Sequence, residues 1–225
     1  MYNPNADQSP FNALPPVVVV LAVAMALVEL VMQAGQSGMF GAPPRIVVME
    51  DYAFLPGVWG YMYSTGQYPP EHMLRFVTYP FLHSSFTHAI FAIVIVLAIG
   101  KAVGEVFSSL AFLAVFFAAS VFGALVYGSL NSVNVPLVGG YPGAYGLIGA
   151  FTFLLWVNLA AVGANAMRAF TFIGFLLGVQ LVFGILFGAG YDWVADVSGF
   201  AIGFALSFLV SPGGWARVRA KLRRN

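Results

Sequence analysis

Charged residues are scarce in this chain and cysteine is absent. Only 8% of its 225 residues are charged, whereas 60% are hydrophobic and the mean hydropathy is +0.89. Soluble domains carry about 25% charged residues, so this composition excludes a soluble globular enzyme. A net charge of +1 gives nucleic-acid binding no electrostatic basis. Without cysteine there is no disulfide, thiol nucleophile or thiolate metal site.

Long apolar runs make up most of the chain and predict a polytopic membrane protein. A helix needs about 20 mostly apolar residues to cross the hydrocarbon core of a bilayer. We therefore expect an all-α bundle of six transmembrane helices. The expected spans lie near residues 17–34, 83–100, 109–130, 143–162, 169–188 and 193–210.

The distribution of basic residues predicts the orientation. Five of the nine Lys and Arg residues follow the last span, and Lys101 and Arg168 fall on the same side of a six-span chain. Only Arg45 and Arg75 fall on the other side, so the positive-inside rule places both termini in the cytoplasm. We expect a cytoplasmic tail (1–16), a membrane domain (17–211) and a basic cytoplasmic tail (212–225).

The first span is expected to be retained, because residues 1–16 contain no Lys or Arg and a signal peptide has a basic n-region. The compact chain, with no transit peptide, favours the bacterial inner membrane. Residues 35–79 are rich in aromatics and proline but poor in charge, which suits an interfacial loop between the first two helices. Glu29 lies near the outer end of the first span, so we expect its carboxylate to snorkel to the interface.

Three segments carry a family resemblance. They are RFVTYPFLHSSFTHAIFA (75–92, followed by GKAVGE at 100–105), GGYPGAYGLIGA (139–150) and ADVSGFAIG (195–203). In order and spacing they resemble the rhomboid intramembrane serine protease family, over about residues 75–210. The resemblance implies a six-helix bundle with a catalytic dyad, formed by a serine that starts the fourth span and a histidine on the sixth. It also implies that a histidine and an asparagine on the second span stabilise the oxyanion.

This chain departs from the family at the catalytic positions. Tyr141 stands in place of the serine, Asp196 in place of the histidine and Ala92 in place of the asparagine, whereas His88 is retained. A competing register would align Tyr145 with the serine, and neither register offers a serine. The residues to which the resemblance gives structural roles are His83, Arg75, Tyr145, Gly199 and Gly203.

These replacements predict a loss of proteolysis. Acyl transfer needs an activated aliphatic hydroxyl and donors aimed at the developing oxyanion. A phenol such as Tyr141 has an ordinary pKa near 10, so its phenolate is a better leaving group than a serine alkoxide. Pro142 has no N–H, and Ala92 donates nothing. We therefore expect a pseudoprotease, with no cofactor, that binds or scaffolds other transmembrane proteins in the lipid bilayer.

Three alternatives remain open. The first is an active serine protease with another nucleophile, such as Ser84, Ser85 or Ser198. The second is a small transporter that uses Asp196 and His88, although inverted repeats are not evident. The third, a metal site at the two span-two histidines, is disfavoured because they lie five residues apart and do not share a helix face.

Three other features have structural explanations. Asp196 is expected to be hydrogen-bonded to Tyr141, Tyr145 or His88 in a vestigial cavity, because an unpaired charge within the membrane is costly. Small residues every four positions along the sixth span predict close helix packing. The phenylalanines of the fifth span predict lipid or core contact, with a partner-helix surface as the alternative (Phe170, Phe172, Phe175, Phe183 and Phe187).

Overall fold

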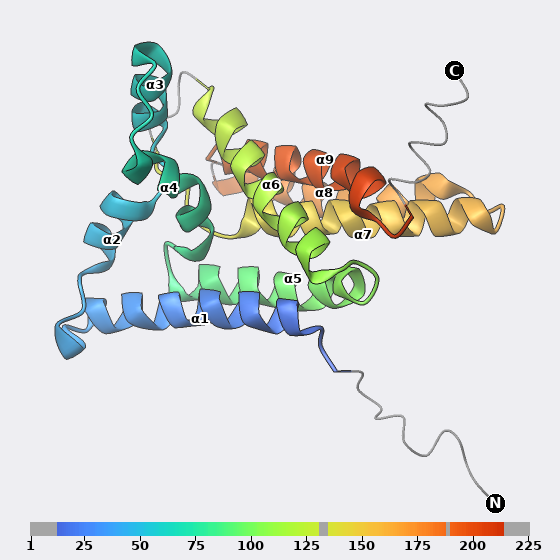
Figure 1. Ribbon diagram of the computed structural model, residues 1–225, viewed down its shortest axis with the longest axis horizontal. Coiled ribbons are helices and arrows are strands. Elements are labelled where there is room, and N and C mark those ends of the chain that lie inside the picture. Colours follow the sequence, from blue (N-terminus) through green and yellow to red (C-terminus); the bar gives the residue numbers. More distant parts are fainter. Residues whose placement is uncertain (1–12, 131–134, 188–189, 214–225) are drawn as a thin grey trace, which may run out of the picture.

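The computed structural model describes residues 13–130, 135–187 and 190–213, so most of both predicted tails lies outside the described residues. The described part is almost entirely helical (Figure 1). Its six long helices are α1 (Pro16–Gln36), α5 (Phe86–Gly104), α6 (Ser109–Gly128), α7 (Tyr141–Ala161), α8 (Thr171–Phe187) and α9 (Asp192–Val210). Three short helices, α2 (Arg45–Tyr52), α3 (Pro56–Thr65) and α4 (Pro70–Thr78), and the 3-10 turns η1 (Met39–Gly41), η2 (Tyr79–Phe81) and η3 (Ala166–Phe170) complete it.

The predicted all-α membrane bundle is confirmed. Five helices in the described part are long and apolar enough to cross a membrane, namely α1, α5, α6, α7 and α9. The remaining predicted span corresponds to α8, which at 17 residues is shorter than the other five. Helix α5 begins at Phe86 rather than at 83, because the Ser85 hydroxyl accepts a hydrogen bond from the His88 N–H and caps the helix there.

The segment between α1 and α5 is more ordered than the loop that its composition predicted. It contains α2, α3 and α4, which gather at one end of the bundle (Figure 1). Pro44 precedes α2, while α3 and α4 begin with Pro56 and Pro70. Proline is well suited to a helix start, because its missing N–H would have no intrahelical partner there. The prolines therefore start helices in this segment rather than merely interrupting structure.

Helix α7 lies at the centre of the bundle and is the most buried of the five helices that are long enough to cross a membrane. It packs on α5, α6 and α9, and glycines allow the close approach to α9. A Cβ at Gly203 would lie 2.0 Å from the carbonyl oxygen of Gly146, and one at Gly199 would lie 2.2 Å from that of Pro142. Gly199 and Gly203 of the predicted small-residue stripe thus lie on the surface of α9 that contacts α7.

The segment that leads into α7 is held by the residues before α5. Phe54 and Leu137 exchange two backbone hydrogen bonds of 3.2 and 2.8 Å. The Gly139 N–H donates to the carbonyl oxygen of Tyr79 at 3.1 Å, and the Tyr79 hydroxyl donates to the Ser120 carbonyl oxygen on α6 at 2.7 Å. These bonds fix the position at which α7 begins.

Candidate functional site

A cavity of about 190 Å³ lies where α5, α7 and α9 begin. Each of these helices contributes side chains from its first turns, so the positive ends of three helix dipoles point toward the same region. This arrangement favours carboxylates, and α9 supplies two of them. The lining residues are His88, Leu137, Val138, Tyr141, Pro142, Asp192 and Asp196.

Tyr141 and His88 form the contact between α7 and α5 in this cavity. Their rings are stacked, with centroids 4.8 Å apart and planes 13° from parallel. The Tyr141 hydroxyl donates to the backbone carbonyl oxygen of His88 at 3.4 Å. The phenol therefore covers the imidazole, and its hydroxyl is directed at the α5 backbone.

The imidazole of His88 is also held from the segment before α5. The Ser84 N–H donates to His88 Nδ1 at 3.3 Å, and the Ser84 hydroxyl oxygen lies 3.0 Å from the same nitrogen. Gly139 lies under the ring with a φ of 101°, and a Cβ there would lie 2.8 Å from a ring carbon of His88. Because Nδ1 accepts the N–H bond, the ring proton is assigned to Nε2.

Asp196 lies on α9 in the same cavity, only 5% exposed. It is close enough to Tyr79, Tyr141 and Tyr145 to interact electrostatically with all three. Burial, and second to it the Asp196 carboxylate, raise the pKa of Tyr79 well above its ordinary value. Asp196, which the resemblance aligns with a catalytic histidine, thus lies near a group of phenols.

The other expected site residues lie around the cavity rather than in it. Ala92 is fully buried in the hydrophobic core of the bundle, beside α1. Tyr145 packs with Ile148 against Ile173 of α8. Arg75 donates to the backbone carbonyl oxygens of Glu50 and Ala53, at 2.8 and 2.9 Å, and so ties α4 to the end of α2.

His83 is fully buried, and its ring lies edge-on to that of His88 with centroids 5.5 Å apart. Burial, and then the neighbouring His88 and Arg45, lower the pKa of His83 to about 4. Its imidazole is therefore neutral over the physiological range. This contact brings His83 and His88 together, although His83 lies before α5 and His88 lies in its first turn.

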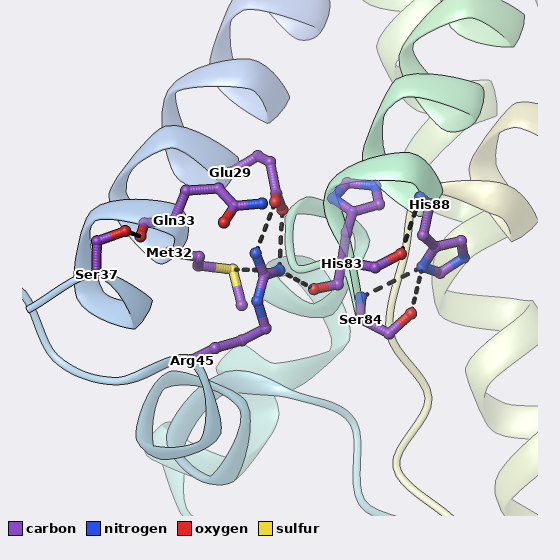
Figure 2. A network of polar contacts seen from close by, with 9 residues as sticks. Glu29, Met32, Gln33, Ser37, Arg45, His83, Ser84 and His88 are labelled. Carbon is purple, nitrogen blue, oxygen red and sulfur yellow. Dashed lines mark hydrogen bonds and ion pairs between the residues drawn. The ribbon is translucent and has the colours of Figure 1, made fainter.

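The expectation that Glu29 snorkels to the interface is wrong. Its side chain is buried, 2% exposed, and forms a two-pronged ion pair with Arg45 of α2 (Figure 2). The two nitrogen–oxygen distances are 3.0 and 2.6 Å. No local sequence pattern predicts this ion pair. The sequence indicated only that an acidic residue lies within the first span and that a basic residue lies on the same, outer side of the membrane.

The polar side chains that line the cavity are a phenol, an imidazole and two carboxylates. None of the described residues that line it carries an aliphatic hydroxyl, and the chain contains no cysteine. Pro142 occupies the first turn of α7, so the backbone has no N–H to donate at that position. Within the described part, no three His, Asp or Glu side chains are arranged to hold a metal ion.

Comparison with known families gives one match. A family model described as the Rhomboid domain matches residues 70–213, which is more than half of the chain. The matched region begins with α4 and contains the cavity and all three resembling segments, whereas α1, α2 and α3 lie outside it. No curated protein matches the chain significantly.

Proposed function

Since the chain belongs to the rhomboid family, we propose that it is a catalytically inactive member that binds or scaffolds other transmembrane proteins. The proposal is supported by one observation, which is that Tyr141 and Asp196 line the same cavity. The resemblance aligns these two residues with the family's nucleophile and base, so a phenol and a carboxylate would stand in place of the catalytic dyad.

The geometry of Tyr141 argues against a role as a replacement nucleophile. Its ring is stacked on His88 and its hydroxyl is engaged by the α5 backbone. A phenol also departs more readily from an acyl intermediate than a serine alkoxide does. Asp196 supplies a carboxyl where the resemblance implies an imidazole base. Neither half of the dyad has the chemistry that peptide-bond cleavage needs.

Binding is supported by what the chain retains. Helices α7 and α9 pack closely through glycines, and a cavity lies at their start. The resemblance aligns no serine and no histidine with the dyad positions. The family fold admits a neighbouring transmembrane helix, so a member without a nucleophile can hold such a helix without cutting it. We further propose the bacterial inner membrane as its location, with both termini in the cytoplasm.

Site-specific photocrosslinking in native membranes tests this proposal. A photoreactive residue replaces Val138, which lines the cavity, and a matched control replaces Val94, an exposed residue on α5. We expect crosslinks to an intact transmembrane protein from position 138 and not from position 94. Recovery of the crosslinked partner as a truncated fragment, with the cut inside its membrane span, would contradict the proposal.

A second candidate function is supported by the contact between Ser84 and His88. The Ser84 hydroxyl oxygen lies 3.0 Å from His88 Nδ1, within reach for proton transfer, and Ser84 is exposed. This candidate is a hydrolase that uses Ser84 as the nucleophile and His88 as the base. Two features argue against this hydrolase. His88 Nδ1 already accepts a hydrogen bond from the Ser84 N–H, and Tyr141 covers one face of the His88 ring. Labelling by a serine-directed fluorophosphonate that is lost in Ser84→Ala would establish the hydrolase.

A further inference from the structure

One guanidinium joins three separate parts of the chain at the cavity end of the bundle. Arg45, at the start of α2, is 6% exposed. It binds the Glu29 carboxylate of α1 through two nitrogens and donates a short hydrogen bond to the backbone carbonyl oxygen of His83 (Figure 2). Both charged residues lie outside the region that matches the family model.

The carbonyl that Arg45 binds belongs to the segment that orients His88. His83 is followed directly by Ser84, whose N–H and hydroxyl both contact His88 Nδ1. Figure 2 shows the sequence of contacts from Glu29 through Arg45 and His83 to Ser84 and His88. Tyr141 then stacks on the His88 ring. A displacement of the His83 carbonyl therefore changes the direction of the groups that hold the imidazole.

We propose that Arg45, anchored by Glu29, is the positioning residue of the cavity: it fixes the backbone at His83 so that Ser84 holds His88 in one orientation and one tautomer. The ion pair thus orients the His88 ring in addition to stabilising the fold. This proposal concerns the same cavity as the proposed function but does not depend on whether a partner binds there.

The energetics of buried ion pairs make it possible to test whether Arg45 positions the His83 carbonyl separately from whether it stabilises the fold. Removing one partner leaves an uncompensated buried charge and is strongly destabilising, whereas replacing both by apolar side chains of similar volume is often neutral. The double variant Glu29→Leu/Arg45→Met should therefore fold, yet it cannot hold the His83 carbonyl. Arg45→Lys is a second variant that keeps the charge opposite Glu29. Its single ammonium lacks the fork that reaches the carboxylate and the carbonyl together.

The test is nitrogen NMR of the purified full chain with 15N-labelled histidine. The sequence contains only three histidines, so each ring can be assigned by substitution. In the unaltered protein we expect His88 to be almost entirely the Nε2–H tautomer. In the double variant and in Arg45→Lys we expect a mixture of both tautomers at His88, while His72 serves as an unchanged internal reference.

Arg75→Met is the matched control. Arg75 also ties the segment before α5 together, but its hydrogen bonds go to Glu50 and Ala53 rather than to His83. It should leave the His88 tautomer as it is. An unaltered His88 tautomer in folded Arg45→Lys or in the folded double variant would overturn the proposal. An equal change in Arg75→Met would overturn it too, because general loosening of the segment would then be the cause.

Discussion

The ring of Tyr141 lies against the imidazole of His88, 4.8 Å between centroids and 13° from parallel. The resemblance aligns Tyr141 with the family's nucleophile and His88 with a histidine that stabilises the oxyanion. If the chain has the proposed function, an aromatic ring lies where the family's acyl intermediate forms. The proposed inactivity then rests on occupied space as well as on missing groups.

The packing of α7 on α9 depends on glycine, and this predicts a strong effect of one methyl group. In Gly203→Ala the added carbon would lie 2.0 Å from the Gly146 carbonyl oxygen, so the two backbones must separate. We expect a loss of about 1–3 kcal/mol in the free energy of unfolding, as for other overpacked cores. Denaturation in mixed micelles measures it.

Gly178→Ala on α8 is the control, because nothing lies within 4 Å of the added carbon there. It should be neutral or slightly stabilising, since alanine favours a helix over glycine by about 1 kcal/mol. Equal losses in both variants would show that the close approach of α7 and α9 is not what holds the bundle together.

Asp196 should act through a polar contact that closes the cavity between α7 and α9. It is buried near the phenols of Tyr141 and Tyr145, so replacing its carboxyl by an apolar side chain removes their electrostatic interaction with it. We expect Asp196→Leu to lower the free energy of unfolding by about 1–3 kcal/mol. Asp196→Asn keeps the shape and the hydrogen-bonding capacity and should cost clearly less. The same micelle denaturation compares them, and a better-tolerated Asp196→Leu would remove this contact from the account.

Restoring the dyad alone should not restore proteolysis. Tyr141→Ser with Asp196→His supplies a nucleophile and a base, but Pro142 still removes a backbone donor and Ala92 still donates nothing. Each oxyanion donor is worth about 2.7–4 kcal/mol of barrier height. Cleavage of a transmembrane reporter should stay near background in the double variant.

Adding Pro142→Gly and Ala92→Asn to that double variant should raise the cleavage rate by more than the product of the separate effects, because the four groups act as a unit. Robust cleavage by the double variant alone would show that the backbone at Pro142 matters less than the two side chains.

The orientation predicted from the basic residues can be tested by fusions. Seven of the nine basic residues sort to one side of a six-span chain. Tags at Met1 and Asn225 should therefore both report the cytoplasm, and a periplasmic reporter fused after Gly35 should be active. Termini that report opposite sides would rule out an even number of spans, and α8 is the helix that would then have to be reassigned.

The sequence predicted what depends on local pattern. Apolar runs set the long helices, and the three motifs brought His88, Tyr141 and Asp196 to one cavity. The pair of Glu29 and Arg45 was missed, because it joins residues 16 positions apart across two helices and neither has a local partner signal.

Helices α2, α3 and α4 were missed for a different reason. They have 8 to 10 residues each and begin at or just after prolines that were interpreted as loop signals. A short helix has no long periodic pattern, so its proline start was the one available indication. In this segment the position of each proline indicates where a helix begins, whereas the overall proline content suggested a loop.

Labelling by a fluorophosphonate, combined with a cleavage assay on a transmembrane substrate, tests the central claim most directly. The full chain in mild detergent is compared with Ser84→Ala and with an active rhomboid protease as the positive control. Because the resemblance aligns a phenol and a carboxylate with the dyad positions, we expect neither labelling nor cleavage above background in either form of this chain. Labelling and cleavage that both disappear in Ser84→Ala would contradict the account and establish an active hydrolase.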